Sequence, residues 1–207
     1  MLSVLGTGYS EKDFLKIDLS ITNQEIQQLE SQLDLTKVIS ARLAQANKKV
    51  AIGGYLEERD FYLDSDLFAD DHRTMHLGID IWLGPQTPIY MPLEGTIVAN
   101  ANNDEYLDYG YTIITQHQWK GELIHCLFGH LSKDKFLDWK MGDHISEGKL
   151  LAYIGTPDEN GGWAPHLHLQ LIRSLDKGAV DYPGVCHKND IAHFKQNCPN
   201  PISWVIP

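Results

Sequence analysis

The sequence predicts a mainly β protein that is α+β at its N-terminus, with an antiparallel β-sheet or sandwich after a helical segment. Apolar side chains recur at helical spacing within residues 22–47. From about residue 49 onward, short apolar runs alternate with turn residues such as Lys120-Gly121 and Met141-Gly142. The composition, 43% hydrophobic and 22% charged, predicts a packed core rather than disorder.

The N-terminal helical pattern has two parts. Thr22 and Glu25 have the spacing of a capping box, the start signal of a helix. Two apolar faces follow at helical spacing, made by Ile26, Leu29 and Leu33 and then by Ile39, Leu43 and Ala46. We therefore expect a helical hairpin packed on a larger domain.

The remainder of the chain is typical of short strands. Apolar runs bounded by turn residues predict strands at 95–101, 111–117, 122–130, 150–155 and 166–172. A short helix is expected near 189–197, before Pro199. These patterns divide the chain into a helical N-terminal segment (1–48), a main domain (49–185) and a C-terminal tail (186–207).

Charge and hydropathy exclude several classes of function. Acidic residues outnumber basic ones by 28 to 17, a net charge of −11, which disfavours nucleic acid and suits a cationic or amine-bearing partner. No stretch reaches the roughly 18 apolar residues of a membrane span. The N-terminus lacks a secretory signal pattern, which predicts a cytoplasmic protein, or a periplasmic or secreted one if the chain is processed. Three cysteines do not make a disulfide framework.

Two segments combine aliphatic and metal-binding side chains in strict alternation. In residues 76–83, HLGIDIWL, the aliphatic positions alternate with a set that includes His76 and Asp80. Residues 166–172, HLHLQLI, do the same with His166 and His168. Alternation places each aliphatic set on one face of a strand and the histidines and aspartate on the other.

The spacing of these residues is compatible with one zinc ion. In a straight strand, His76 and Asp80 would be about 13 Å apart at their alpha carbons, so the chain must bend, and Gly78 is the place where it can. His166 and His168 share a face, and either one can supply a third ligand. Three protein ligands leave the fourth tetrahedral position for water, as in catalytic zinc sites. His130, at the end of LFGHL (127–131), carries little information alone.

The motifs HLGID, LFGHL and PHLHLQ, in this order and with fitting spacers, resemble the M23 (LytM-like) zinc metallopeptidases. The likeness covers residues ~74–172. It implies the LytM-like antiparallel fold, a duplicated hybrid motif, and one Zn²⁺ per chain held by His76, Asp80 and His168. It further implies that His130 and His166 are catalytic. The family's HLHFE reads HLHLQ here, with Gln170 for Glu, and its YGH reads FGH, with Phe128 for Tyr.

The segments at 51–62, 158–168 and 181–201 resemble more closely an M23-type domain of some large bacterial proteins. There the domain lies between a phosphotransferase-like and a class-III aminotransferase domain. The first resemblance implies a zinc endopeptidase or amidase acting on a peptide, with peptidoglycan cross-links as a candidate target. The second favours a cytoplasmic hydrolase of a small amide or amine metabolite. A non-catalytic scaffolding module of the same fold is a third hypothesis.

Other residues receive plainer interpretations. Cys186, His187, His193 and Cys198 match no strong zinc pattern and are interpreted as ordinary tail residues, with a second zinc or a Cys186–Cys198 disulfide as alternatives. Cys126 is interpreted as a small core residue. Trp82 and Trp163 lie beside the motifs, where core or rim packing is favoured over a role in lining a cleft.

Overall fold

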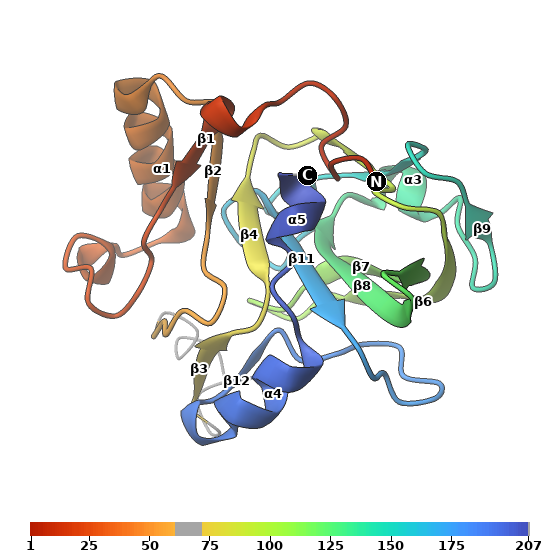
Figure 1. Cartoon of the computed structure of the whole chain (residues 1–207). Coiled ribbons are helices and arrows are strands. Elements are labelled where there is room, and N and C mark those ends of the chain that lie inside the picture. Colours follow the sequence, from red (N-terminus) through yellow and green to blue (C-terminus); the bar gives the residue numbers. More distant parts are fainter. Residues whose placement is uncertain (61–71, 207) are drawn as a thin grey trace.

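A computed structural model describes residues 1–60 and 72–206, so part of the segment 51–62 lies outside the described residues. An eight-stranded sheet dominates it, in the order β1-β2-β4-β11-β8-β7-β6-β9 (Figure 1). Its strands are β1 (Phe14–Lys16), β2 (Val50–Gly53), β4 (Ile79–Trp82), β6 (Gly95–Asn103), β7 (Gly110–Trp119), β8 (Glu122–Leu131), β9 (His144–Ile145) and β11 (His166–Ile172). Every pair is antiparallel except β1 with β2. The mainly β prediction is confirmed, with a mixed sheet.

Two small sheets complete the β structure. Strand β5 (Pro88–Tyr90) pairs with β10 (Leu150–Tyr153), and β3 (Arg73–His76) pairs with β12 (Val185–His187). The predicted strands at 95–101, 111–117, 122–130, 150–155 and 166–172 are all present, within two residues at most ends. Because β12 spans residue 185 and β1 lies before residue 48, both flanking segments contribute strands to the sheets.

The predicted helical hairpin is wrong. One α-helix forms, α1 (Gln32–Ala46), with Ser31 as its N-cap accepting a hydrogen bond from the Asp34 amide at 3.2 Å. The expected capping box at Thr22 is replaced by turns and a short 3-10 helix, η2 (Ile26–Gln28). The Ser31 hydroxyl donates to the Asp34 carboxylate and accepts from the Asp34 amide, which caps the helix at this residue.

Helix α1 lies against the β1–β2 edge of the sheet (Figure 1). Its apolar stripe packs on side chains of β2 and β4 and on the segment after β1, in a cluster formed by Ile17, Leu19, Ile26, Leu35, Ile39, Ala51, Trp82 and Ala164. Leu33, predicted to lie on the buried face, is 63% exposed because its helix begins at residue 32 and not at residue 22. The helix therefore covers the β1–β2 edge of the sheet, and its apolar cluster reaches Trp82 of β4.

The C-terminal tail returns to the start of the chain. The expected helix is present as α4 (Ile191–Asn197), preceded by η4 (Lys188–Asp190), and a second helix that the sequence pattern did not reveal, α5 (Ile202–Val205), follows it. The Val4 amide donates to the Trp204 carbonyl at 2.9 Å, so the two ends of the chain lie side by side (Figure 1). Two short elements remain, η1 (Glu11–Asp13) and α3 (Lys133–Phe136).

The sheet centre is buried on both faces. All seven residues of β11 are buried, between β4 and β8. Its aliphatic side chains join a core cluster that extends over the sheet and includes Ile79 and Ile81 of β4. Within the described residues, no helix has the length and apolar character that a membrane span requires. The polar side chains of β11 and β4 thus project from a rigid, tightly packed base.

Candidate metal centre

The chain bends at Gly78, as the sequence predicts. Strand β3 ends at His76 and pairs with β12, whereas β4 begins at Ile79 and belongs to the main sheet. A Cβ at Gly78 would lie 2.7 Å from ring atoms of His168, a separation that no real Cβ tolerates. Glycine is therefore required here because the His168 ring passes over the bend.

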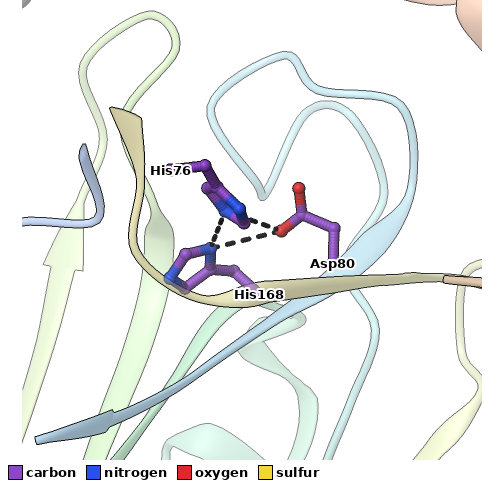
Figure 2. Close-up of side chains that lie close together, drawn as sticks. All are labelled: His76, Asp80 and His168. Atoms are coloured by element: carbon purple, nitrogen blue, oxygen red, sulfur yellow. Dashed lines mark hydrogen bonds and ion pairs between the residues drawn. The ribbon is translucent and has the colours of Figure 1, made fainter. Parts of the chain in front are cut away.

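The bend brings His76, Asp80 and His168 together (Figure 2). His168 faces Asp80 directly across the β11–β4 pair, and His76 reaches the same point from β3. His76 Nε2 is 2.9 Å from His168 Nδ1, and Asp80 Oδ1 is 3.3 Å from the first and 3.2 Å from the second. The three residues are 2–3% exposed.

This triangle fits one zinc ion. Ligand atoms about 2.1 Å from a tetrahedral zinc are separated from one another by roughly 3.4 Å. The observed edges of 2.9, 3.2 and 3.3 Å need only a small expansion. Two imidazole nitrogens and one carboxylate oxygen are also the donor set of a catalytic zinc site.

The histidine tautomers suit metal binding. His76 Nδ1 lies 2.8 Å from the Gly54 carbonyl oxygen, which can only accept, so Nδ1 carries the hydrogen and Nε2 the lone pair. Burial lowers the pKa of His76 to about 4. The ring is consequently neutral at pH 7, the form that binds metal.

Gln170 fixes the tautomer of His168. The Gln170 amide nitrogen donates to the Pro183 carbonyl at 3.1 Å, which turns Oε1 toward His168. His168 Nε2 lies 2.9 Å from that oxygen and donates to it, which leaves the Nδ1 lone pair facing Asp80 and His76. Gln170 therefore performs the accepting role that a glutamate would have at this position.

Replacing Gln170 by glutamate is expected to destabilise the protein, although it restores the common residue of the family motif. One carboxylate oxygen would face the Pro183 carbonyl without a hydrogen between them, at a side chain that is 0% exposed. We expect a loss of about 2–3 kcal/mol in the free energy of unfolding, because a buried charge is left partly unpaired. Urea unfolding of the wild type and of Gln170→Glu measures this loss of stability. The control is Gln116→Glu, which makes the same substitution at a half-buried glutamine of β7. Equal stability would contradict the assignment of Gln170 as an amide donor.

The partners of Asp80 could not be recognised from the sequence pattern. Its second oxygen, Oδ2, accepts from Arg59 Nη1 at 2.6 Å, and Arg59 Nε donates to Glu57 at 2.6 Å. Burial alone would raise the pKa of Asp80, but His76 and Arg59 hold it well below its usual range. In the sequence, these partners are visible only as a glutamate and an arginine two residues apart, Glu57 and Arg59. Such a pair is common in proteins and does not indicate a metal site.

His130 and His166 lie beside the three candidate ligands. Their ring centroids are 4.2 Å apart, and His166 Nε2 is 3.6 Å from Asp80 Oδ1. In each ring, Nδ1 donates a hydrogen bond to a backbone carbonyl oxygen. The partner of His166 is the Ala164 carbonyl at 2.7 Å, and that of His130 is the Asn160 carbonyl at 3.1 Å. Nε2 is thus the lone-pair nitrogen in both rings.

The surroundings keep both histidines uncharged. Burial lowers the pKa of His130 well below its usual value, and burial also lowers the pKa of His166. His130 has a positive φ of 62°, so its backbone occupies the left-handed region that side chains rarely adopt. Such strain is typical of functional positions, where the rest of the fold holds it in place.

A cavity of about 150 Å³ opens over these groups. Trp82 and Trp163 line it while remaining 4–5% exposed, so they pack in the core and also form its wall. Trp82 stacks on His166 at 5.8 Å, and Trp163 meets His130 edge-on at 5.9 Å. The favoured interpretation of both tryptophans, packing rather than cleft lining, was therefore incomplete.

The remaining histidines and cysteines do not belong to the candidate ligand group, although Cys198 Sγ accepts from Gln170 Nε2 at 3.5 Å. His117 and His125 are buried and bonded to other groups, whereas His72 and His144 are exposed. Cys126, Cys186 and Cys198 are free and buried, and the last two pack in one apolar cluster. Among the described residues, His76, Asp80 and His168 are the one group placed so that they could hold a metal, and Cys186 and Cys198 are not joined by a disulfide.

The sequence model of Peptidase family M23 matches residues 74–182, slightly more than half of the chain. The chain is 22% identical to lysostaphin, over 65% of its own length and 49% of the lysostaphin chain, with a TM-score of 0.41. It is 22% identical to a zinc-containing peptidase from Vibrio cholerae, over 53% of its own length and 32% of the other, with a TM-score of 0.40. The chain thus spans half or less of each of these proteins. None of the curated proteins matches it.

Proposed function

Since this chain belongs to peptidase family M23, we propose that it is a zinc-dependent endopeptidase or amidase that hydrolyses a peptide bond. The observation that carries the proposal is the triangle of His76 Nε2, Asp80 Oδ1 and His168 Nδ1, with edges of 2.9–3.3 Å between side chains of β3, β4 and β11. We assign these three side chains as ligands of one zinc ion. The fit of the triangle to tetrahedral zinc supports the assignment.

A zinc ion held by His76, Asp80 and His168 would supply Lewis acid chemistry at this site, by acidifying a water molecule and polarising a carbonyl group. His130 and His166 supply the acid–base chemistry in the proposal. Both are neutral and 5% exposed, and each has its lone pair at Nε2. A neutral imidazole can accept a proton from the attacking water and return it to the leaving amine.

Family membership supports a peptide substrate, and we propose the peptide cross-links of peptidoglycan as the target. The apolar side chains of Trp163, Leu107 and Val185 form part of the cavity wall beside the histidines. Such a wall can accommodate an uncharged peptide segment. This is consistent with the net charge of −11, which disfavours polyanionic substrates.

The test combines metal analysis with product analysis. We expect about one zinc per chain in the wild type and none in His168→Ala. Incubation with purified peptidoglycan and a peptide library, followed by mass spectrometry, should give new termini from a single bond type. His130→Ala should retain zinc yet lose roughly 10²–10⁴-fold in rate, the range for a general acid or base.

His144→Ala is the matched control, because that histidine is exposed and lies in the edge strand β9, far along the sheet from β11. It should leave both zinc content and rate unchanged. A wild-type protein that takes up no transition metal after zinc is supplied contradicts the proposal. Full activity in His130→Ala contradicts the catalytic role of that residue.

One observation favours a second candidate, a hydrolase of a small amide that carries an amino group. Asp108 and Asp181 both line the cavity of about 150 Å³ beside the histidines. Burial raises the pKa of Asp181 to about 6 and also raises that of Asp108, and each carboxylate would be stabilised by a cation. Cleavage of small amino-amides, with none of peptidoglycan, would favour this candidate over the first.

A further inference from the structure

A segment outside the family match lies along the metal centre. The match begins at residue 74, whereas residues 54–59 precede it. The Leu56 amide donates to the His76 carbonyl at 2.9 Å, and the His76 amide donates to the Glu57 carbonyl at 3.0 Å. The Arg59 amide then donates to the Thr74 carbonyl at 2.8 Å. Residues 54–59 therefore lie alongside β3, the strand that carries His76, and form backbone hydrogen bonds with it.

This segment inserts one buried cation into the site. The Arg59 side chain is 1% exposed and lies between Asp80 and Glu57, with 2.6 Å bonds to a carboxylate oxygen of each. Glu57 is held in turn, since its Oε1 accepts from the Leu19 amide at 3.2 Å. A Cβ at Gly54 would lie 1.8 Å from Arg59 Nη2, so glycine at this position leaves the space that the guanidinium fills.

A guanidinium at this position does not strengthen zinc binding through its charge. It bonds directly to a zinc ligand, and two cations repel each other at such short range even at an effective dielectric of about 20. Arg59 must therefore affect the site through its hydrogen bond to Asp80 and not through its charge. A carboxylate can bind zinc through one oxygen or through both, and Arg59 occupies Oδ2.

We propose that Arg59 is a positioning residue that restricts Asp80 to metal binding through Oδ1 alone. Figure 2 shows Oδ1 turned toward both histidines and the other oxygen turned away. With one carboxylate oxygen engaged, three protein atoms would hold the ion, and a fourth position would be left for water and substrate. The bond from Arg59 also withdraws electron density from Asp80, which would leave a bound ion more electrophilic. This inference rests on the proposed zinc site.

The test replaces zinc by cobalt(II), whose visible absorption is strong in four-coordinate sites and weaker in five-coordinate ones. In Arg59→Met, Asp80 is free to bind through both oxygens, and we expect the absorption to fall at least about twofold as a fifth ligand atom is added. Arg59→Lys, which keeps a donor for Oδ2, should retain most of the absorption. Zinc affinity, measured by competition with a chelator, should be unchanged or tighter in Arg59→Met, because a cation has been removed.

Arg42→Met is the matched control, since Arg42 pairs with Glu25 at the surface and is distant from Asp80. If Arg59→Met fails to fold, Arg59→Gln replaces it: glutamine is neutral, too short to reach Oδ2, and leaves room for water beside the carboxylates. An unchanged cobalt spectrum in the neutral variant overturns the proposal, and so does complete loss of metal binding, which would make Arg59 a general scaffold residue. A wild type that binds neither cobalt nor zinc overturns the proposed function itself, a separate result.

Discussion

Replacing Asp80 by alanine is expected to abolish zinc binding and to destabilise even the metal-free protein by about 3 kcal/mol. Asp80 is 3% exposed and forms a buried ion pair with Arg59. Removing one partner of such a pair typically costs 3–5 kcal/mol, because an uncompensated charge stays buried. We expect the lower end of the range, because Glu57 still neutralises Arg59 from its other side. Urea unfolding in the presence of a chelator measures the loss.

A neighbouring ligand separates the two effects. His76→Ala should also abolish zinc binding, yet it removes a neutral ring and leaves the Arg59–Asp80 pair intact. Its metal-free form should therefore lose less stability than Asp80→Ala. In the double variant Arg59→Met/Asp80→Ala, both charges are gone, so it should be more stable than Asp80→Ala alone. A double variant as unstable as the sum of the two single variants would contradict the buried-pair explanation.

The sequence predicted the central strands, and it singled out His76, Asp80 and the pair His166 and His168, because these features depend on short-range pattern. The choice of His168 over His166 as a candidate ligand came from the resemblance to the M23 family. If residues 166–172 form a strand, their alternation places the leucines on one face and His166 and His168 on the other. Strand β11 has this arrangement. The bend at Gly78 follows from the distance that His76 and Asp80 must close. Helix α1 was predicted less accurately, because Thr22 and Ser31 are both acceptable caps and only tertiary packing decides between them.

The surroundings of the ligands could not be predicted, because they come from distant parts of the chain. Arg59 meets Asp80 across 21 positions, and Gln170 meets the Pro183 carbonyl across 13. Helix and strand periodicity relates residues that are close in the sequence, so it predicts neither of these contacts. Residue type was also a poor guide, since Gln170 replaces the family's glutamate and still holds His168 through its amide oxygen.

Acid is expected to destabilise the metal-free protein steeply between pH 6.5 and pH 4. Burial lowers the pKa of His76 and of His117 to about 4, and it also lowers those of His125, His130 and His166. When the folded-state pKa lies below the unfolded value near 6.5, the unfolded chain binds protons that the folded chain refuses. The stabilisation from these neutral rings is thus complete above pH 6.5 and is lost as the pH falls toward 4.

Asp181 and Asp108 act in the opposite direction, because burial raises the pKa of both carboxyl groups, that of Asp181 to about 6, and their contribution is lost as the pH rises above 3.8. They are two partly exposed groups against five histidines, so the histidines decide the sign. His117 isolates the effect, since it lies away from the metal centre and is bonded to Thr115 at 2.6 Å and to the Glu94 carbonyl at 2.9 Å. At pH 5 it should contribute a loss of about 2 kcal/mol. Urea unfolding at pH 7.5 and pH 5 should therefore show a drop in His117→Asn that is smaller by that amount than in the wild type. An identical drop in both proteins would mean that His117 is already protonated in the folded state or does not titrate on unfolding.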